Sequence, residues 1–179
     1  MPHGFGGFKN RSISPITAIN RGQFDTVFHV NFTTTLTDKA PDNVAHFLVR
    51  AFPPGALNAR IMFRVEGAAL FSIYEAPALT GLVSQVLPFN THRGSPITPV
   101  STFWDDFSFS DIGTPLLVNT FFPALSHGNV LIDAGGVGGE FVSKTNEDFV
   151  LQVENIGGKT NVISIPILFY EPPEVTGTL

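Results

Sequence analysis

The clearest structural signal in the chain is the stretch FDTVFHVNF at residues 24–32. Phe24, Phe28, Val30 and Phe32 occupy alternate positions, and successive side chains of an extended chain point to opposite faces. One face of this stretch is therefore apolar. The pattern predicts a half-buried β-strand.

The same alternation recurs in the segment that follows the first third of the chain. Residues 60–66 place Ile61, Phe63 and Val65 on one face, and residues 69–73 repeat the pattern after Gly67. Because only a short break separates the two runs, we predict that they form a hairpin.

Two further strands are expected near the C-terminus. Residues 148–154 and 161–170 alternate in the same way, and the turn-forming sequence NIGG at 155–158 separates them. Pro166 cannot donate a ladder hydrogen bond, so we expect it on an edge strand or at a bulge. Additional strands are expected at 44–50 and within 97–132.

Composition agrees with an all-β chain. The sequence has 18 Phe, 17 Gly and 14 Pro, and the Gly and Pro residues divide it into runs too short for helices. We expect about eight strands in a jelly-roll-like antiparallel β-sandwich. The predicted organisation is an extended N-terminal arm at 1–20, one sandwich domain at 21–171 and a tail at 172–179.

Charge restricts the class of partner. Only 14% of residues are charged and the net charge is -5, with no basic block, so we expect no nucleic-acid partner. The low charge also favours apolar contacts with other subunits and hence a homo-oligomer. No secretory signal or membrane-spanning stretch is recognised, so we expect synthesis in the cytoplasm and no membrane partner.

No pattern typical of catalysis or metal binding is found. The chain has no cysteine and five histidines, none at a metal-ligand spacing; His29 and His46 are interpreted as hydrogen-bonded structural histidines within strands. The segment 103–111 could offer carboxylates to calcium but lacks the ligand spacing, and is interpreted as an exposed aromatic loop. The glycine run 135–139 is not followed by the Lys-Ser/Thr of a phosphate loop. We expect no catalytic residue, no cofactor and no metal.

Several segments together resemble a family of tailed-bacteriophage virion proteins. The resemblance covers residues 44–171. Its motifs are a strand ending in Phe-x-Leu-Tyr-Glu-x-Pro, an Asn-Arg-Asn-Arg-x-Ser loop, a Glu-(Trp/Phe)-x-Leu-Lys strand, a strand ending in Leu-Arg-Val-x-Asn and a closing Trp-Tyr-Glu. This chain has Gln152 in place of the motif's Arg and Phe169 in place of its Trp. The matching segments here are 69–77, 89–98, 139–144, 149–155 and 161–171.

The resemblance implies a capsid decoration or cement protein on the outer surface of the virion, with the major capsid protein as its partner. We expect a trimer, assembled in the host cytoplasm, whose arm extends along its neighbours. Aromatic and arginine side chains dominate many interfaces. The expected contact residues are Phe5, Phe8, Arg11, Phe103 and Trp104.

Two alternatives remain open at this level. The same sandwich could be a tail or head-fibre module that binds host carbohydrate or a receptor, with Trp104 and Tyr74 as stacking platforms. It could also be a hydrolase, which would require a cleft with convergent titratable groups.

Overall fold

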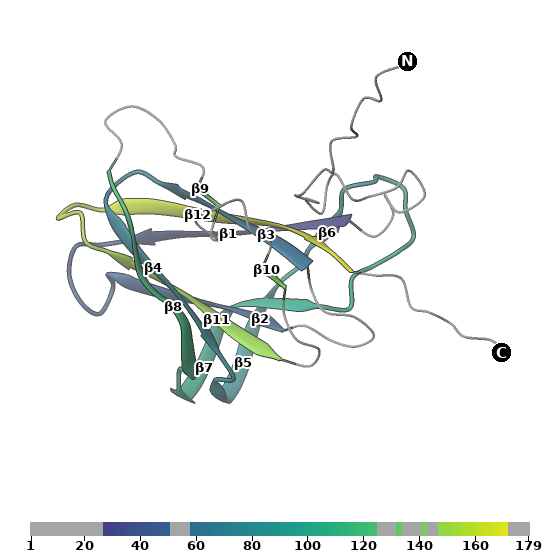
Figure 1. The fold of residues 1–179 in the computed structure, drawn as a ribbon, viewed down its shortest axis with the longest axis horizontal. Coiled ribbons are helices and arrows are strands. Elements are labelled where there is room, and N and C mark those ends of the chain that lie inside the picture. The colour runs from purple at the N-terminus through teal and green to yellow at the C-terminus, as the bar shows by residue number, and fades with distance from the viewer. Residues whose placement is uncertain (1–26, 51–57, 125–131, 134–140, 143–146, 172–179) are drawn as a thin grey trace, which may run out of the picture.

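The computed structural model describes residues 27–50, 58–124, 132–133, 141–142 and 147–171 (Figure 1). Within these residues every regular element is a strand, and two antiparallel sheets pack face to face. The prediction of an all-β sandwich is confirmed. The predicted arm at 1–20, the tail at 172–179 and the glycine run 135–139 lie outside the described residues.

The two sheets contain strands from the whole described chain. The first sheet runs in the order β10 (Phe141–Val142), β3 (Asn58–Val65), β12 (Asn161–Tyr170), β1 (Val27–Leu36) and β6 (Phe89–Asn90), with β9 (Ile132–Asp133) also paired to β3. The second runs in the order β5 (Ala78–Val86), β7 (Thr102–Asp111), β2 (Val44–Arg50), β11 (Asp148–Asn155), β4 (Ala69–Glu75) and β8 (Thr114–Phe122).

The strand order is that of a jelly roll. The strands β1, β12 and β3, with the short β9 and β10, oppose β2, β11, β4 and β8, and the chain passes between the sheets from β1 to β2, β2 to β3, β3 to β4 and β11 to β12. Two interleaved Greek keys of this kind define the eight-stranded jelly roll. Between β4 and β8 the chain inserts a ribbon of two further long strands, β5 and β7.

The predicted hairpin of residues 60–66 and 69–73 is wrong. Both segments are strands, β3 and β4, but they lie in opposite sheets, where β3 pairs with β12 and β4 pairs with β11. Their apolar faces point at each other across the core, and the rings of Phe63 and Phe71 have centroids 3.9 Å apart. The alternation identified the buried faces correctly, and the pairing partners come from a distant part of the chain.

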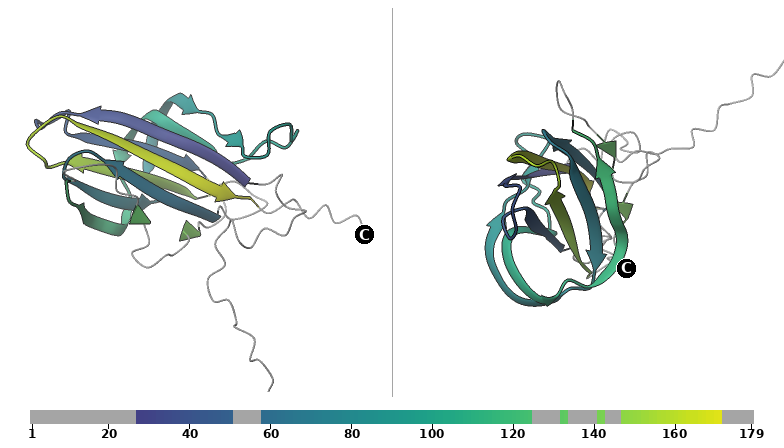
Figure 2. Two further views of the ribbon diagram at one scale, coloured as in Figure 1. Left: turned by 90° about the horizontal axis from the view of Figure 1, so that it is seen from above. Right: turned by 90° about the vertical axis from the view of Figure 1, so that its left-hand side faces the viewer.

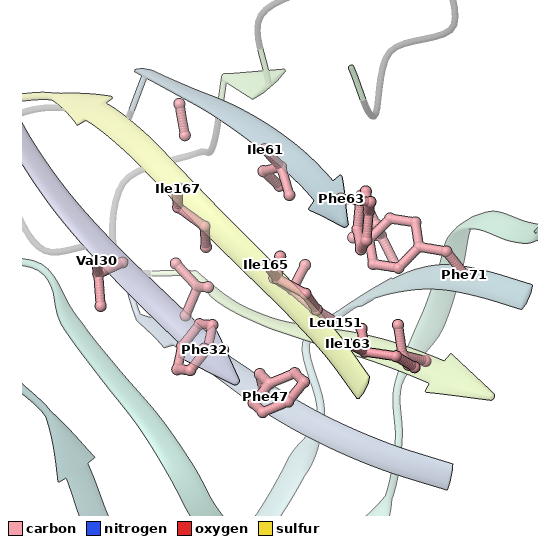
Figure 3. Close-up of a cluster of buried hydrophobic side chains, with 14 of the residues drawn as sticks. Val30, Phe32, Phe47, Ile61, Phe63, Phe71, Leu151, Ile163, Ile165 and Ile167 are labelled. Atoms are coloured by element: carbon pink, nitrogen blue, oxygen red, sulfur yellow. The ribbon is translucent and has the colours of Figure 1, made fainter. Parts of the chain in front are cut away.

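Aromatic and branched aliphatic side chains fill the space between the sheets (Figure 3). Phe32 of β1 stacks on Phe47 of β2 with ring centroids 4.6 Å apart, and Phe103 packs on Phe169 at 4.9 Å. The residues predicted to face the core in the described strands are all buried there: Phe28, Val30, Phe32, Ile61, Phe63, Val65, Ala69, Phe71, Ile73, Phe149, Leu151, Val153, Ile163, Ile165, Ile167 and Phe169.

The second sheet is buried on both faces near its centre. Leu48 and Val150 point away from the main core, yet both are 0% exposed. On the same face His46 contacts Phe109 of β7, with ring centroids 5.1 Å apart. The inserted ribbon therefore bends across the outer face of this sheet, as the curved β5 and β7 in the right-hand view of Figure 2 show.

Two buried asparagines join three of the loops that connect the sheets. The Nδ2 of Asn155 donates to the carbonyl oxygens of Thr37 and Lys159, each at 2.7 Å. The Oδ1 of Asn161 accepts from the backbone N–H of Gly67 at 2.8 Å. The connections after β1, β3 and β11 are thus tied together at one end of the sandwich, where buried backbone groups need partners.

Pro166 does not lie on an edge strand. It belongs to β12, which pairs with β1 on one side and with β3 on the other. The ladder to β3 is interrupted at Ile165 and Pro166 without a change of register, between the pairs Ser164–Arg64 and Ile167–Ile61. A gap in the ladder accommodates the residue that has no N–H.

Candidate functional site: two apolar surface patches

The predicted contact residues do not form one surface. Phe103 is 0% exposed and packs in the core against Phe169 and Phe32, so the prediction that it is an exposed contact is wrong. Its segment is also not a loop, because Thr102–Asp111 forms β7. Phe5, Phe8 and Arg11 lie outside the described residues.

The strand at 102–111 has a sequence signal that its acidic residues obscured. Phe103, Phe107 and Phe109 occupy alternate positions, which is the period of a strand, whereas Asp105 and Asp106 favoured the interpretation as a solvated loop. In the structure these two carboxylates are exposed. The part of the chain that the structure describes contains no group of three or more potential metal ligands.

Trp104 and Tyr74 do not form a common stacking platform. The register places Trp104 of β7, Leu48 of β2, Val150 of β11 and Tyr74 of β4 in one row on the outer face of the second sheet. Two buried aliphatic side chains therefore separate the aromatic rings, which are each half-buried. The spacing across three strand intervals is about 14 Å, too wide for one sugar ring to touch both.

The two strand histidines are held by packing. His29 of β1 contacts Phe89 at 4.9 Å between ring centroids, and among the described residues its Nδ1 has no hydrogen-bond partner. Burial, and secondarily the positive charge of Arg64, lowers the pKa of His29. Burial likewise lowers the pKa of His46. Both histidines are therefore favoured in the neutral form.

Apolar side chains reach the surface along β8, an edge strand of the second sheet. Leu117 faces the core, while Leu116 and Val118 are exposed. At Asn119 the backbone has φ 52, and the N–H donates to Ser72 Oγ at 3.0 Å. We call the exposed large apolar side chains of this strand the β8 strip, and they are Leu116, Val118 and Phe121.

The local irregularity at Asn119 decides which phenylalanine is exposed. Leu117 and Phe122 are an odd number of residues apart, so regular alternation would put them on opposite faces. The register shift between the Leu117 and Thr120 pairs brings Phe122 back to the core. Phe122 is 2% exposed, whereas its neighbour Phe121 is 57% exposed.

A second group of exposed apolar residues lies in the segment that leads from β5 through β6 to β7. Leu87 is 77% exposed and Phe89 58%. Asn90 Nδ2 donates to the Ile97 carbonyl oxygen at 3.2 Å, which draws the two sides of this segment together. We call the exposed apolar side chains of this segment the end patch, and they are Leu87, Phe89, Ile97 and Val100.

A buried carboxylate fixes one end of this segment. Glu171 follows β12 and is 7% exposed, and its two oxygens accept from the backbone N–H groups of Val100 at 2.8 Å and Ser101 at 2.7 Å. Hydrogen bonds to a carboxylate are stronger than neutral ones. On the other side, the N–H of Thr91 donates to the Val27 carbonyl oxygen at 2.9 Å.

Two residues from the motifs of the virion resemblance have structural roles. Asn155, the last residue of the Val-x-Asn motif, ties the loops at one end of the sandwich. Glu171, the last residue of the aromatic-Tyr-Glu motif, fixes the start of β7. These positions therefore carry the fold and contribute no exposed functional group.

Comparisons with known proteins found no family model and no curated protein that matches the chain. The described residues contain no helix that could span a membrane.

Proposed function

We propose that this chain is a virion structural protein of a tailed bacteriophage that binds the outer capsid surface as a decoration or cement protein. The observation that carries the proposal is the exposed apolar surface of the β8 strip and the end patch. A soluble domain with a complete core has no use for these side chains in its own interior, and exposed apolar patches mark interaction sites.

The composition supports a role based on contact. Only 14% of the residues are charged, against about 25% in a typical globular domain. Packing against a particle requires shape and apolar area, and many identical contacts on one particle strengthen attachment without any chemistry.

The motifs of the resemblance add a second kind of support. Asn155 and Glu171 both form hydrogen bonds that hold separate parts of the jelly roll in place. Because these residues stabilise the connections of the sandwich, a similarity at their positions favours a fold shared with the virion proteins. The proposed location on the capsid surface and the proposed partner, the major capsid protein, are both implied by the resemblance to virion proteins.

The test is to add the purified chain to phage particles that lack it. We expect saturable binding to the heads and an increase in the temperature at which the particles release DNA. Isolated tails and host cells serve as the comparison samples. Binding to tails or to cells without binding to heads would contradict the proposal, as would full occupancy of heads without added heat resistance.

A further inference from the structure

The segment that carries the end patch also presents a cation to solvent. Arg93 is exposed and forms no ion pair among the described residues. It lies between β6 and β7, in the segment that projects as a teal loop from one end of the sandwich in the left-hand view of Figure 2. Phe89 and Ile97 of the end patch flank it along the chain and are also exposed. Arginine and aromatic side chains together are typical of the residues that dominate the energy of an interface.

Arg93 is at the tip of a tight turn. The N–H of Ser95 donates to the His92 carbonyl oxygen at 3.1 Å, so Arg93 and Gly94 are the two central residues of a four-residue turn. Gly94 has φ +94, the left-handed backbone that a type II turn has at its second central residue. The backbone conformation at Arg93 is therefore set by its own turn.

Side-chain hydrogen bonds join the two sides of this turn. Asn90 Oδ1 accepts from the His92 N–H at 2.8 Å, and Asn90 Nδ2 donates to the Ile97 carbonyl oxygen at 3.2 Å. Ser95 Oγ accepts from the Ile97 N–H, also at 3.2 Å. A surface that is already ordered loses little conformational entropy on binding. The loop is thus built to present Arg93 before any partner arrives.

The charges at the end patch differ in sign from the net charge of -5 of the whole chain. Glu171, the carboxylate that contacts this segment, is 7% exposed and uses both oxygens on backbone N–H groups. The positive charge of Arg64 acts on His29, whose ring contacts Phe89. Among the described residues, the charges that the end patch offers to a partner are therefore positive.

Exposed or partly exposed carboxylates lie beside other surfaces of the second sheet. The register places Glu154 of β11 and Phe121 of the β8 strip on either side of Leu70, in one row across the sheet. On the inserted ribbon, Asp105 and Asp106 are exposed. A partner surface that carries carboxylates is attracted by the end patch and repelled at these places.

We propose that the end patch and Arg93 together dock on the major capsid protein, at an apolar surface that carries a carboxylate opposite Arg93. The inference rests on the proposed function and deepens it, because it names the face of the domain that makes the contact and the chemistry of the surface it meets. A guanidinium can form two parallel hydrogen bonds with one carboxylate. Phe89 and Leu87, the two most exposed members of the end patch, supply the apolar area around this pair.

The test compares the affinities of full-length variants for phage heads that lack the chain. Arg93→Glu should weaken binding about 30-fold or more, and Arg93→Gln about fivefold or more. Lys159→Glu makes the same change of charge at the end where Asn155 ties the loops, and should bind within about twofold of the wild type. Phe89→Asp should weaken binding more than Val118→Asp does. If Phe89→Asp unfolds, Phe89→Ser replaces it in this comparison.

The salt dependence of the association rate separates a charge contact from a structural role. The wild type should associate faster than Arg93→Gln at low salt, and the difference should shrink as the salt concentration rises. Thermal unfolding of the isolated variants checks that the domain is intact. Because Arg93 has no ion-pair partner among the described residues, its substitutions should move the Tm by less than about 2 °C.

The outcomes distinguish this contact from the role on the capsid. If the wild type binds heads and Arg93→Glu binds equally well, the proposed function stands and the end patch is not the docking face. If the wild type does not bind heads, the proposed function and this inference both fail. If Arg93→Glu lowers the mass of the chain in solution, as measured by light scattering, the loop contacts a second copy and the inference is overturned.

Discussion

The interior of the sandwich and its two surface patches are built from the same residue types but have opposite environments. Phe122 completes the core beside Phe63, while Phe121, the adjacent residue on β8, is exposed. In the interior, regular alternation and pairing bring apolar side chains from both sheets together. At the patches the fold holds apolar side chains at the surface by specific hydrogen bonds. The first set stabilises the domain, and we propose that the second set serves contacts with other chains.

The largest loss of stability is expected when the buried member of these two neighbouring phenylalanines is truncated. Phe122→Ala removes a buried ring and should lower the free energy of unfolding by about 3–5 kcal/mol. Phe121→Ala is the matched control and should change it by less than about 0.5 kcal/mol. Denaturant unfolding at low protein concentration checks both values and keeps any contribution from assembly small. Equal losses at the two positions would remove the distinction between core and patch.

The next largest effect should come from the loop-tying asparagine. Asn155→Ala leaves the carbonyl oxygens of Thr37 and Lys159 without their donor, at a cost of about 2–3 kcal/mol. Asn90→Ala removes two exposed hydrogen bonds, one to the Ile97 carbonyl oxygen and one from the His92 N–H, and should cost less than about 1 kcal/mol because water can replace them. Both can be measured by denaturant unfolding, and a reversed order would contradict the structural role of Asn155.

A glycine at the base of the inserted ribbon offers a test of the backbone. Gly113 has φ +99, and a Cβ there would collide with the backbone carbonyl of Glu75. Gly94 has φ +94 in open space. Gly94→Ala should cost about 1 kcal/mol for its left-handed backbone, and Gly113→Ala about 1–3 kcal/mol more. Thermal unfolding measures the difference, and similar losses would mean that the ribbon relaxes around the new methyl group.

A smaller effect is expected at the ion pair between Arg50 of β2 and Asp148 of β11. Arg50 and Asp148 form two parallel hydrogen bonds, at 2.7 and 2.8 Å, which raise the pKa of Arg50. Because both side chains are partly exposed, Asp148→Asn should lower the free energy of unfolding by less than about 1 kcal/mol. The loss should shrink in high salt; a salt-independent loss would point to packing instead of charge.

The smallest expected effect is a dependence of stability on pH. Burial lowers the pKa of His29 and His46 in the folded chain, so the unfolded chain takes up protons first as the pH falls. The stabilisation is complete above the ordinary histidine value of about 6.5 and is lost progressively below it. His46→Gln should reduce the change in the free energy of unfolding between about pH 7.5 and 5.5. If the double variant with His29→Gln kept the wild-type pH dependence, the two histidines would not be its source.

Alternation in the sequence predicted which side chains face the core because it depends only on the local geometry of a strand. Alternation could not predict that β3 and β4 belong to different sheets, since β3 pairs with β12 and β4 with β11, and both partners lie far along the chain. The burial of Leu48 and Val150 on the outer face of the second sheet depends on the inserted ribbon. No local sequence pattern predicts that the ribbon covers this face.

The sequence also predicted an apolar excess at the surface, but it named Phe103 and Trp104 and missed the exposed apolar residues of β8 and of the segment after β5. Leu116 and Leu117 are the same residue type, so the sequence does not show which one is exposed. The register of β8 exposes Leu116 and turns Leu117 toward the core. The bulge at Asn119 then reverses the pattern for Phe121 and Phe122. The prediction that Phe103 is exposed failed for the same reason, because its environment is set by pairing between β7 and β2.

The most direct test of the account is to compare the stability and the particle binding of the double variant Phe89→Asp/Val118→Asp with those of the wild type. We expect an unfolding free energy within about 1 kcal/mol of that of the wild type, together with at least about tenfold lower occupancy on phage heads than the wild type. Wild-type occupancy by the folded double variant would contradict the claim that these apolar surfaces exist for contacts with other chains.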